Sequence, residues 1–311
     1  MSEPMELSGL DGDNLLGFLA ALGTLVSLSE SAEFEDVRLD WTLSDGWRPR
    51  LLTSRPTGRE EVVAVLASRL SRPEAAQPFE IPLASGRLAE DLTIEPMDYR
   101  AYTSRAATSN DRRLADFANA FGSESVSASN GYIADTAFRT MSGAGHQHFL
   151  GSMRELVSCT EAPHFEAALF SPWTYEDDRP TMRWDPQDDR RYALRWKEPS
   201  GDKIQTVRGA NRLAIEGLRF FPVVPVGGRA TTTAFRGRGA SDTVVTWPIW
   251  EVPLGPDAVR ALVASAALQT AVRSDSGSMR FILRRQGVVE IFQSRRLTLG
   301  KYRSFSPARP A

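Results

Sequence analysis

Two of the three histidines in this chain lie close together, in the stretch RTMSGAGHQHFLGSMREL that runs from Arg139 to Leu156. His146 and His148 follow a Gly-Ala-Gly turn, and this pattern suits a metal site, a phosphate-binding turn or the start of a helix. Residues two apart point in different directions on a helix, and a zinc site needs three or four ligands. The sequence therefore predicts no metal and no cofactor. It favours a helix start, with a contact from His146 to nucleic acid left open.

A run of acidic residues offers a second kind of chemistry. Carboxylates hold Mg²⁺ for phosphodiester cleavage, so the run defines an alternative in which the chain is a metal-dependent nuclease. The acids are interleaved with arginines, as in a solvated loop with salt bridges, and no Walker motif or G-x-S-x-G elbow accompanies them. We therefore expect a protein that is not an enzyme. The acids of the run are Glu176, Asp177, Asp178, Asp185, Asp188 and Asp189.

Charge is divided unevenly along the chain. Residues 1–180 hold 15 lysines and arginines against 28 aspartates and glutamates, whereas residues 181–311 hold 22 against 11. All but three of the 37 basic residues are arginines, whose planar guanidinium suits phosphate and base recognition. The asymmetry indicates either docking of one part on the other or a polyanionic partner for the basic part. A purely structural interaction protein, in which the two parts neutralise each other, is therefore an alternative.

The arginines of the basic part lie beside glycines and aromatic residues. Arg208 and Arg212 are four apart, on one face of a predicted helix, and Tyr302 and Phe305 are interleaved with the last basic residues. Cationic side chains neutralise phosphates and aromatic faces stack on bases, so we expect contact with nucleic acid. The candidate contacts are Arg208, Arg212, Arg236, Arg238, Arg284, Arg285, Arg295, Arg296, Lys301 and Arg303, together with His146.

Apolar spacing predicts the elements that must position these residues. A buried helix is expected from Leu15, capped by Asp13 or Asn14, in which Gly23 indicates close packing against another backbone. Alternation predicts a β-hairpin over 37–52. We expect one helix over 255–273, two strands over 279–296 around Arg-Gln-Gly, and a disordered end to the chain. The predicted fold is α+β, with mixed, mostly antiparallel sheets and packed helices.

The stretch SPWTYEDDRPTMRWDPQDDRRYALRW is the best candidate for a boundary, because the charge changes sign across it. We expect an acidic α+β part over 1–175 that docks on partner proteins, and an Arg-rich α+β part over 176–311 that contacts nucleic acid. The single cysteine, Cys159, excludes an internal disulfide framework and suits a reducing cytoplasm. No secretory signal is expected, and no apolar stretch is long enough to span a membrane.

Three regions carry a family resemblance: LDGDNLLGFLAALGTL near the start, FRTMSGAGHQHFLGSMREL in the middle, and RWDPQDDRRYALRW with GANRLAIEGLRFFPV and TWPIW in the second half. They resemble CRISPR-associated proteins of type I-G systems, formerly called I-U. The resemblance implies a non-catalytic subunit of a Cascade surveillance complex, an antiviral assembly that holds guide crRNA and opens target DNA by base pairing. It implies guide crRNA, target DNA and other Cascade subunits as partners, with no membrane and no small-molecule substrate. The turn from Gly143 to His148 and the segment from Arg208 to Arg212 are carried over only as contact candidates.

Overall fold

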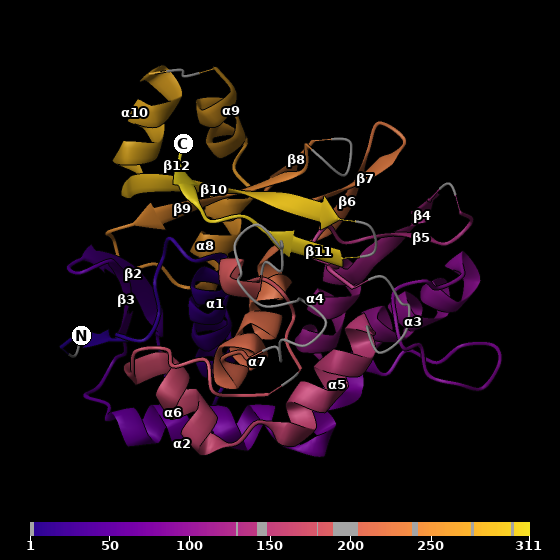
Figure 1. Ribbon diagram of the computed structural model, residues 1–311, viewed down its shortest axis with the longest axis horizontal. Helices are drawn as coiled ribbons and strands as arrows, with labels where there is room; N and C mark the ends of the chain where they lie inside the picture. Colours follow the sequence, from indigo (N-terminus) through magenta and orange to yellow (C-terminus); the bar gives the residue numbers. More distant parts are fainter. Residues whose placement is uncertain are drawn as a thin grey trace, which may run out of the picture.

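Helix α1 (Leu15–Ser29) lies at the centre of the fold and packs along α7 (Arg208–Gly217), as Figure 1 shows. An antiparallel sheet lies over one side of this helix pair, and α2 (Arg59–Leu70) with α6 (Ala162–Phe170) lies on the other. The predicted α+β fold is confirmed by this combination of packed helices and antiparallel sheets. The computed structural model describes residues 3–128, 130–141, 148–178, 180–188, 205–237, 242–274, 277–299 and 302–311.

The sequence of α1 explains its central position. Asn14 caps the helix, because its side-chain oxygen accepts hydrogen bonds from the backbone N–H groups of Leu16 and Gly17, at 2.9 and 3.3 Å. Every residue from Leu15 to Leu28 is buried, as expected of a helix that is apolar on all sides. A Cβ atom on Gly23 would lie 1.8 Å from the backbone oxygen of Leu213 in α7, so only glycine fits. The close backbone packing predicted for Gly23 is confirmed.

The strands form antiparallel sheets throughout the described residues. Their bounds are β1 (Met5–Glu6), β2 (Arg38–Leu43), β3 (Trp47–Leu52), β4 (Gly122–Ser127), β5 (Ile133–Asp135), β6 (Val223–Val226), β7 (Arg229–Thr232), β8 (Phe235–Arg236), β9 (Val244–Trp250), β10 (Val288–Leu299), β11 (Tyr302–Phe305) and β12 (Arg309–Pro310). The largest sheet has the order β11-β10-β9-β8, with β12 paired to β10. A smaller sheet has the order β1-β3-β2, so the predicted hairpin over 37–52 is confirmed, and β4–β5 and β6–β7 form two further hairpins.

The remaining helices correct three predictions. Their bounds are α3 (Pro96–Thr108), α4 (Arg112–Phe121), α5 (Phe149–Cys159), α8 (Pro256–Val263), α9 (Ala266–Ser274), α10 (Gly277–Arg285), η1 (Pro73–Phe79), η2 (Pro186–Asp188) and η4 (Leu218–Phe220). The single helix predicted over 255–273 is two, because the chain turns at 264–265, where the Ser265 hydroxyl accepts a hydrogen bond from Ala267. The strand predicted before Arg-Gln-Gly is wrong, since those residues form α10. The disordered end is also wrong, because β12 pairs with β10.

One hydrophobic core joins the acidic and the basic parts of the chain. The indole N–H of Trp247 donates to the backbone oxygen of Gly12, and that of Trp250 donates to Leu39, both at 2.8 Å. The ring of Phe18 lies 5.8 Å from Trp247 and 6.3 Å from Trp250. The core therefore includes residues from both sides of the boundary predicted at 175 and 176.

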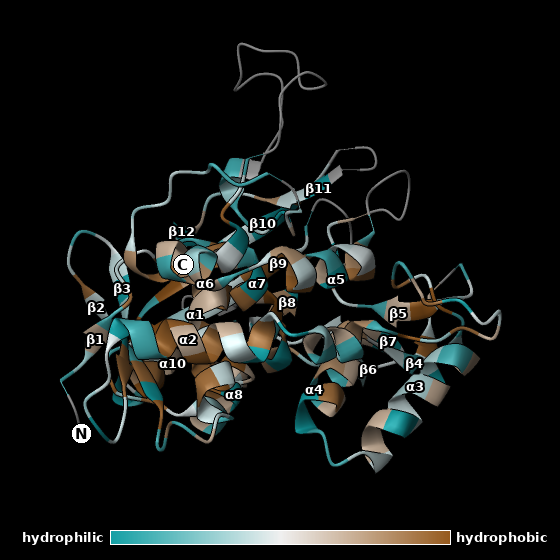
Figure 2. Cartoon of the chain, turned by 90° about the horizontal axis from the view of Figure 1, so that it is seen from below, coloured by the Kyte–Doolittle hydropathy of each residue, from teal (hydrophilic) through white to brown (hydrophobic). Residues whose placement is uncertain are grey.

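Figure 2 shows how hydropathy follows this packing. Helix α2 carries both hydrophobic and hydrophilic turns, since Val62, Leu66 and Leu70 are buried while Glu60 is exposed. Across the described residues, no helix combines the length and the apolar character that crossing a membrane requires.

Gly23→Ala tests the contact between α1 and α7. Helix propensity alone predicts a gain of about 1 kcal/mol. The clash with Leu213 predicts instead a loss of about 3 kcal/mol or more in the free energy of unfolding, because a backbone atom cannot move aside without separating the helices. Urea denaturation measures the difference. The control is Gly277→Ala at the start of α10, where a Cβ meets nothing within 4 Å, and there no loss is expected.

Candidate functional site

The histidine stretch begins a helix. His148 occupies the N-cap position of α5, in extended conformation, and its side chain makes no capping hydrogen bond. The helix start predicted for this stretch is therefore confirmed at His148. His146 and the turn over 143–147 lie outside the described residues, so their predicted contact with nucleic acid remains a prediction. Within the described ranges, no three histidine, cysteine, aspartate or glutamate residues gather in a group suited to a metal ion.

The acidic run serves to hold loops together. Asp177 accepts a hydrogen bond from the backbone N–H of Arg208 at 2.8 Å and so caps α7. Asp185 is buried, and its carboxylate accepts hydrogen bonds from the Asn14 amide at 3.3 Å and the Tyr175 hydroxyl at 3.0 Å. Burial raises the pKa of Asp185. These two carboxylates form hydrogen bonds at the starts of different helices, α7 and α1. Asp189 and the side chain of Asp188 lie outside the described part.

Arg212 is the clearest correction among the predicted contacts. Its side chain is fully buried, with Nε donating to the backbone oxygen of Leu70 at 3.1 Å and Nη1 to Glu216 at 3.0 Å. Burial lowers the pKa of Arg212 to about 10, which leaves the group charged at neutral pH. Its prediction as a nucleic-acid contact is wrong, because α7 is covered by neighbouring helices on the face that Arg212 occupies. Arg208, at the first turn of α7, is half-buried, and its Nη1 lies 3.1 Å from His164 Nε2.

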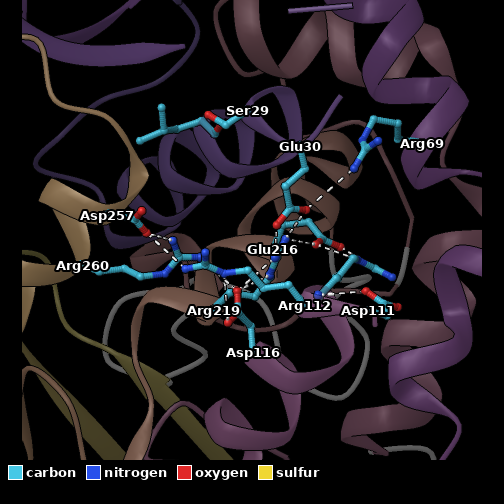
Figure 3. Close-up of polar contacts among 12 residues, drawn as sticks. Ser29, Glu30, Arg69, Asp111, Arg112, Asp116, Glu216, Arg219, Asp257 and Arg260 are labelled. Atoms are coloured by element: carbon cyan, nitrogen blue, oxygen red, sulfur yellow. Dashed lines mark hydrogen bonds and ion pairs between the residues drawn. The ribbon is translucent and has the colours of Figure 1, made fainter. Parts of the chain in front are cut away.

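Glu216 is the centre of a buried ion network, drawn in Figure 3. Its side chain is fully buried and accepts hydrogen bonds from Arg113 at 2.7 Å and from Arg212 at 3.0 Å. Arg219 lies 3.6 Å away on the other carboxylate oxygen. Burial opposes ionisation of Glu216, but the three guanidinium charges outweigh it and hold the pKa of this carboxyl far below its usual range. Glu216 thus stays ionised although its side chain is fully buried.

The network extends from Arg219 to the acidic part of the chain. Arg219 is buried and pairs with Glu30, and its Nη2 lies 3.0 Å from Asp116. Asp116 in turn accepts a hydrogen bond from Arg260 at 2.9 Å, and Arg260 pairs with Asp257 at 3.0 Å, as Figure 3 shows. Two arginines from the basic part are therefore neutralised by acids from the first 175 residues. Part of the positive charge of residues 181–311 is therefore neutralised inside the fold.

Three other candidates converge on one pocket. Arg236 from β8, Arg296 from β10 and Arg303 from β11 line a cavity of about 400 Å³ where these strands approach the β5 and β7 hairpins (Figure 1). In the β10–β11 hairpin Thr298 is paired with Arg303, and residues two apart on a strand share a face. Arg296, Thr298 and Arg303 therefore point to the same side of the sheet. Asp135 is the one acid among the lining residues.

Two guanidinium groups of this pocket, those of Arg296 and Arg303, have backbone oxygens as hydrogen-bond partners. Arg296 Nη1 donates to the backbone oxygen of Ala137 at 3.1 Å, and Arg303 Nη1 donates to that of Arg139 at 3.4 Å. Nε of Arg296 is buried and has no hydrogen-bond partner in the described part of the chain. Burial lowers the pKa of Arg296, and the like charge of Arg303 adds to this effect while Asp135 opposes it. Two cations on one face of the β10–β11 hairpin thus line the same cavity, an arrangement that a bound anion would stabilise.

Hydroxyl groups and a glycine complete the walls. Thr231 and Thr298 line the pocket and are exposed. Gly237 has a φ of +99°, and a Cβ there would lie 2.1 Å from the backbone oxygen of Asp242. Only glycine lets the chain leave β8 so close to Asp242. The pocket therefore offers guanidinium and hydroxyl donors from rigid strands, as a site for a phosphate group requires.

The other predicted contacts lie elsewhere. Arg284 and Arg285 are exposed at the end of α10, and Arg295 is exposed on β10. Arg284 lines a separate groove of about 420 Å³ between α10 and β10, beside the exposed ring of Phe281. These residues do not line the arginine pocket. Arg238 and Lys301 lie outside the described residues.

Sequence reasoning missed Asp135 and Thr231. Asp135 comes from the hairpin at 122–135 and Thr231 from the hairpin at 223–232, both far in sequence from Arg296 and Arg303. For the lining residues of β10 and β11 the sequence did contain a signal. A hairpin predicted across Gly300 would have placed Arg296, Thr298 and Arg303 on one face. Compared with known proteins, the chain matches no family model, no curated protein and no solved structure.

Glu216→Gln tests the ion network. Removing this charge leaves three guanidinium groups poorly compensated in the interior, so we expect a loss of about 3 to 5 kcal/mol in the free energy of unfolding at pH 7. The lowered pKa also predicts a pH dependence. The contribution of an ionised Glu216 is complete above the unfolded value near 4.5 and is lost as the pH falls below it.

The measurement is urea denaturation between pH 3 and pH 7. Wild-type stability should fall on the acid side more steeply than that of Glu216→Gln. Glu61→Gln is the control, because Glu61 forms an exposed ion pair with Arg55 on the surface. Equal losses in the two variants would contradict the role given to Glu216.

Proposed function

We propose that this protein is a non-catalytic nucleic-acid-binding subunit of a type I CRISPR (Cascade) antiviral surveillance complex, and that its arginine pocket holds a backbone phosphate. The observation that carries the proposal is the pair Arg296 and Arg303, two cations facing one cavity with only neutral oxygens as hydrogen-bond partners in the described residues. Among the described residues, the lining includes three arginines and one aspartate. A phosphate carries both the charge and the oxygen acceptors that such a pocket lacks.

The contrast with the buried ion network supports this proposal over a purely structural role. Arg219 and Arg260 belong to the basic part and are paired with Asp116 from the acidic part. If mutual neutralisation were the purpose of the charge asymmetry, Arg296 and Arg303 would have carboxylate partners of the same kind. The acid of the pocket, Asp135, accepts a hydrogen bond from Arg139 through Oδ2, and no ion pair joins it to Arg296 or Arg303 within the described residues. This supports an external anion as the partner of these two cations.

The resemblance to type I-G proteins supplies the biological setting. In effector complexes of this kind base pairing reads the sequence, while protein subunits bind the nucleic-acid backbone and recognise its shape. A phosphate pocket without a catalytic group suits that task. On this proposal guide crRNA and target DNA are the nucleic-acid partners, the other Cascade subunits dock on the acidic surface, and the complex works in the cytoplasm.

Arg296→Ala and Arg303→Ala test the phosphate pocket. Each substitution should weaken binding of a single-stranded oligonucleotide about tenfold, because a charge-assisted hydrogen bond is lost. Each should also reduce the slope of log affinity against log salt by about 0.7, the value for one phosphate contact on a single strand. Fluorescence anisotropy over a salt series measures both quantities. Arg296→Lys should retain part of the affinity, since the charge remains while the planar fork is lost.

The matched control is Arg38→Ala. Arg38 is an arginine on β2 whose exposed side chain forms an ion pair with Asp36. The substitution removes the same charge as the pocket variants do, but outside the pocket. Affinity should be unchanged in this variant. Binding that is absent, insensitive to salt, or equally reduced by Arg38→Ala would refute the pocket as a phosphate site.

Co-purification tests the assembly. When the tagged chain is expressed with the other proteins and the repeat array of a type I-G locus, we expect crRNA and Cascade subunits in the purified complex. The double variant Arg296→Ala/Arg303→Ala should lose crRNA, whereas Arg38→Ala should retain it. Recovery of the chain without crRNA and without subunits would contradict membership of the complex and leave the phosphate pocket to be judged by the oligonucleotide assay.

A further inference from the structure

Asp135 is an unusual component of a pocket for anions. It ends β5, its side chain is 30% exposed, and it lines the cavity together with the three arginines. Its Oδ2 accepts a hydrogen bond from Arg139 at 2.6 Å, and no hydrogen bond to its Oδ1 is found among the described residues. The pocket therefore contains a carboxylate oxygen that is still able to accept a hydrogen bond.

Neutralisation of Arg139 does not account for this carboxylate. Arg139 Nε lies 2.6 Å from Asp91, which is 8% exposed and does not line the pocket. One buried carboxylate already balances the charge of Arg139, so Asp135 supplies a second negative charge. That charge repels any phosphate in the pocket, unless the ligand also brings a hydrogen-bond donor to Oδ1.

A ribose hydroxyl is the donor that accompanies a phosphate in nucleic acid. The 2′-hydroxyl of RNA lies on the carbon next to the one that bears the 3′ phosphate, and DNA lacks it. Carboxylates accept hydrogen bonds from ribose 2′-hydroxyls in other phosphate-binding sites, and the 2′-hydroxyl is the group by which proteins distinguish RNA from DNA. At about 400 Å³ the cavity falls within the range of pockets that hold small ligands, roughly 300 to 1,000 Å³.

We propose that the pocket selects ribonucleotides: Arg296 and Arg303 hold the phosphate, while Oδ1 of Asp135 accepts the hydrogen bond of the adjacent 2′-hydroxyl. This inference rests on the proposed function and deepens it, because it assigns the pocket to an RNA strand and not to DNA. Thr231 and Thr298, which line the same cavity with exposed side chains, are positioned to complete the polar contacts of the sugar-phosphate unit.

The test compares three single strands of one sequence: RNA, DNA and 2′-O-methyl RNA. Wild-type protein should bind RNA about tenfold more tightly than DNA, as expected for one hydrogen bond to a charged acceptor. The 2′-O-methyl strand should behave like DNA, since its 2′ oxygen has no hydrogen to donate. In Asp135→Ala the RNA-to-DNA ratio should fall close to one, while DNA affinity rises because a repulsive charge is gone. Free adenosine 3′-monophosphate and its 2′-deoxy form, used as competitors, show whether one nucleotide is sufficient for the preference.

Asp91→Asn is the matched control. It removes the other carboxylate partner of Arg139 without changing a lining residue of the pocket, so the RNA-to-DNA ratio should stay at the wild-type value. Thermal unfolding of both variants shows whether either disturbs the fold. If Asp91→Asn lowers the ratio as much as Asp135→Ala does, the effect comes from Arg139 and the inference is wrong.

Two failures are distinguishable. If Asp135→Ala strengthens RNA and DNA binding by the same factor and the ratio is unchanged, Asp135 is only a charge and the selection of ribose is refuted, while phosphate binding stands. If Arg303→Ala leaves the affinity for both strands and its salt dependence unchanged, the proposed function itself fails.

Discussion

The contact between the backbones of α1 and α7 is the constraint on which the rest of the fold depends. A Cβ on Gly23 would lie 1.8 Å from the oxygen of Leu213, and one on Gly217 would lie 2.2 Å from that of Leu19. On its other side α7 approaches α6 in the same way through Gly209. Helices this close leave no room for side chains or water between them, so α7 is buried from Gly209 to Gly217. Its polar residues must then find partners in the interior.

These pairings determine which charged side chains remain available to bind a partner. Asn211 is satisfied by donating to Thr206 and accepting from the backbone of Met182, and Arg212 and Glu216 pair with each other. Arginines from α4 and η4 also surround Glu216, and acids from the first part of the chain complete the network. The net charge of +11 over residues 181–311 therefore overstates what this part presents to a partner. Arg296 on β10 and Arg303 on β11 lie outside this network, and their hydrogen bonds go to backbone oxygens.

Local patterns in the sequence predicted the elements with short-range causes. The cap at Asn14, the close packing at Gly23 and the hairpin over 37–52 each depend on a few neighbouring residues, and each is confirmed. Burial of α7 depends on residues from four other segments, so the sequence around Arg212 resembles an amphipathic surface helix and led to a wrong prediction. Helix α10 was mistaken for a strand because Phe281 and Ile282 favour strands, although both are exposed in the structure.

The candidate site was predictable only in part, for the same reason. The arginine composition identified Arg236, Arg296 and Arg303, but it gave equal weight to Arg212, and only the fold separates a buried ion pair from a lining residue. Asp135 could not be found from the sequence, because β5 pairs with β4 and only tertiary packing brings Asp135 to the pocket, whose arginines follow it by about 100 positions or more.

The position of the pocket on strands also affects the free energy of ligand binding. Arg296 is held by β10 on one side and by the backbone of Ala137 on the other, so little side-chain entropy remains to be lost when a ligand binds. Partial burial and the like charge of Arg303 both lower the pKa of Arg296, so the pocket disfavours its charged form. An anion that binds only the folded state offsets that repulsion. On the proposed function, phosphate binding would therefore stabilise the folded state.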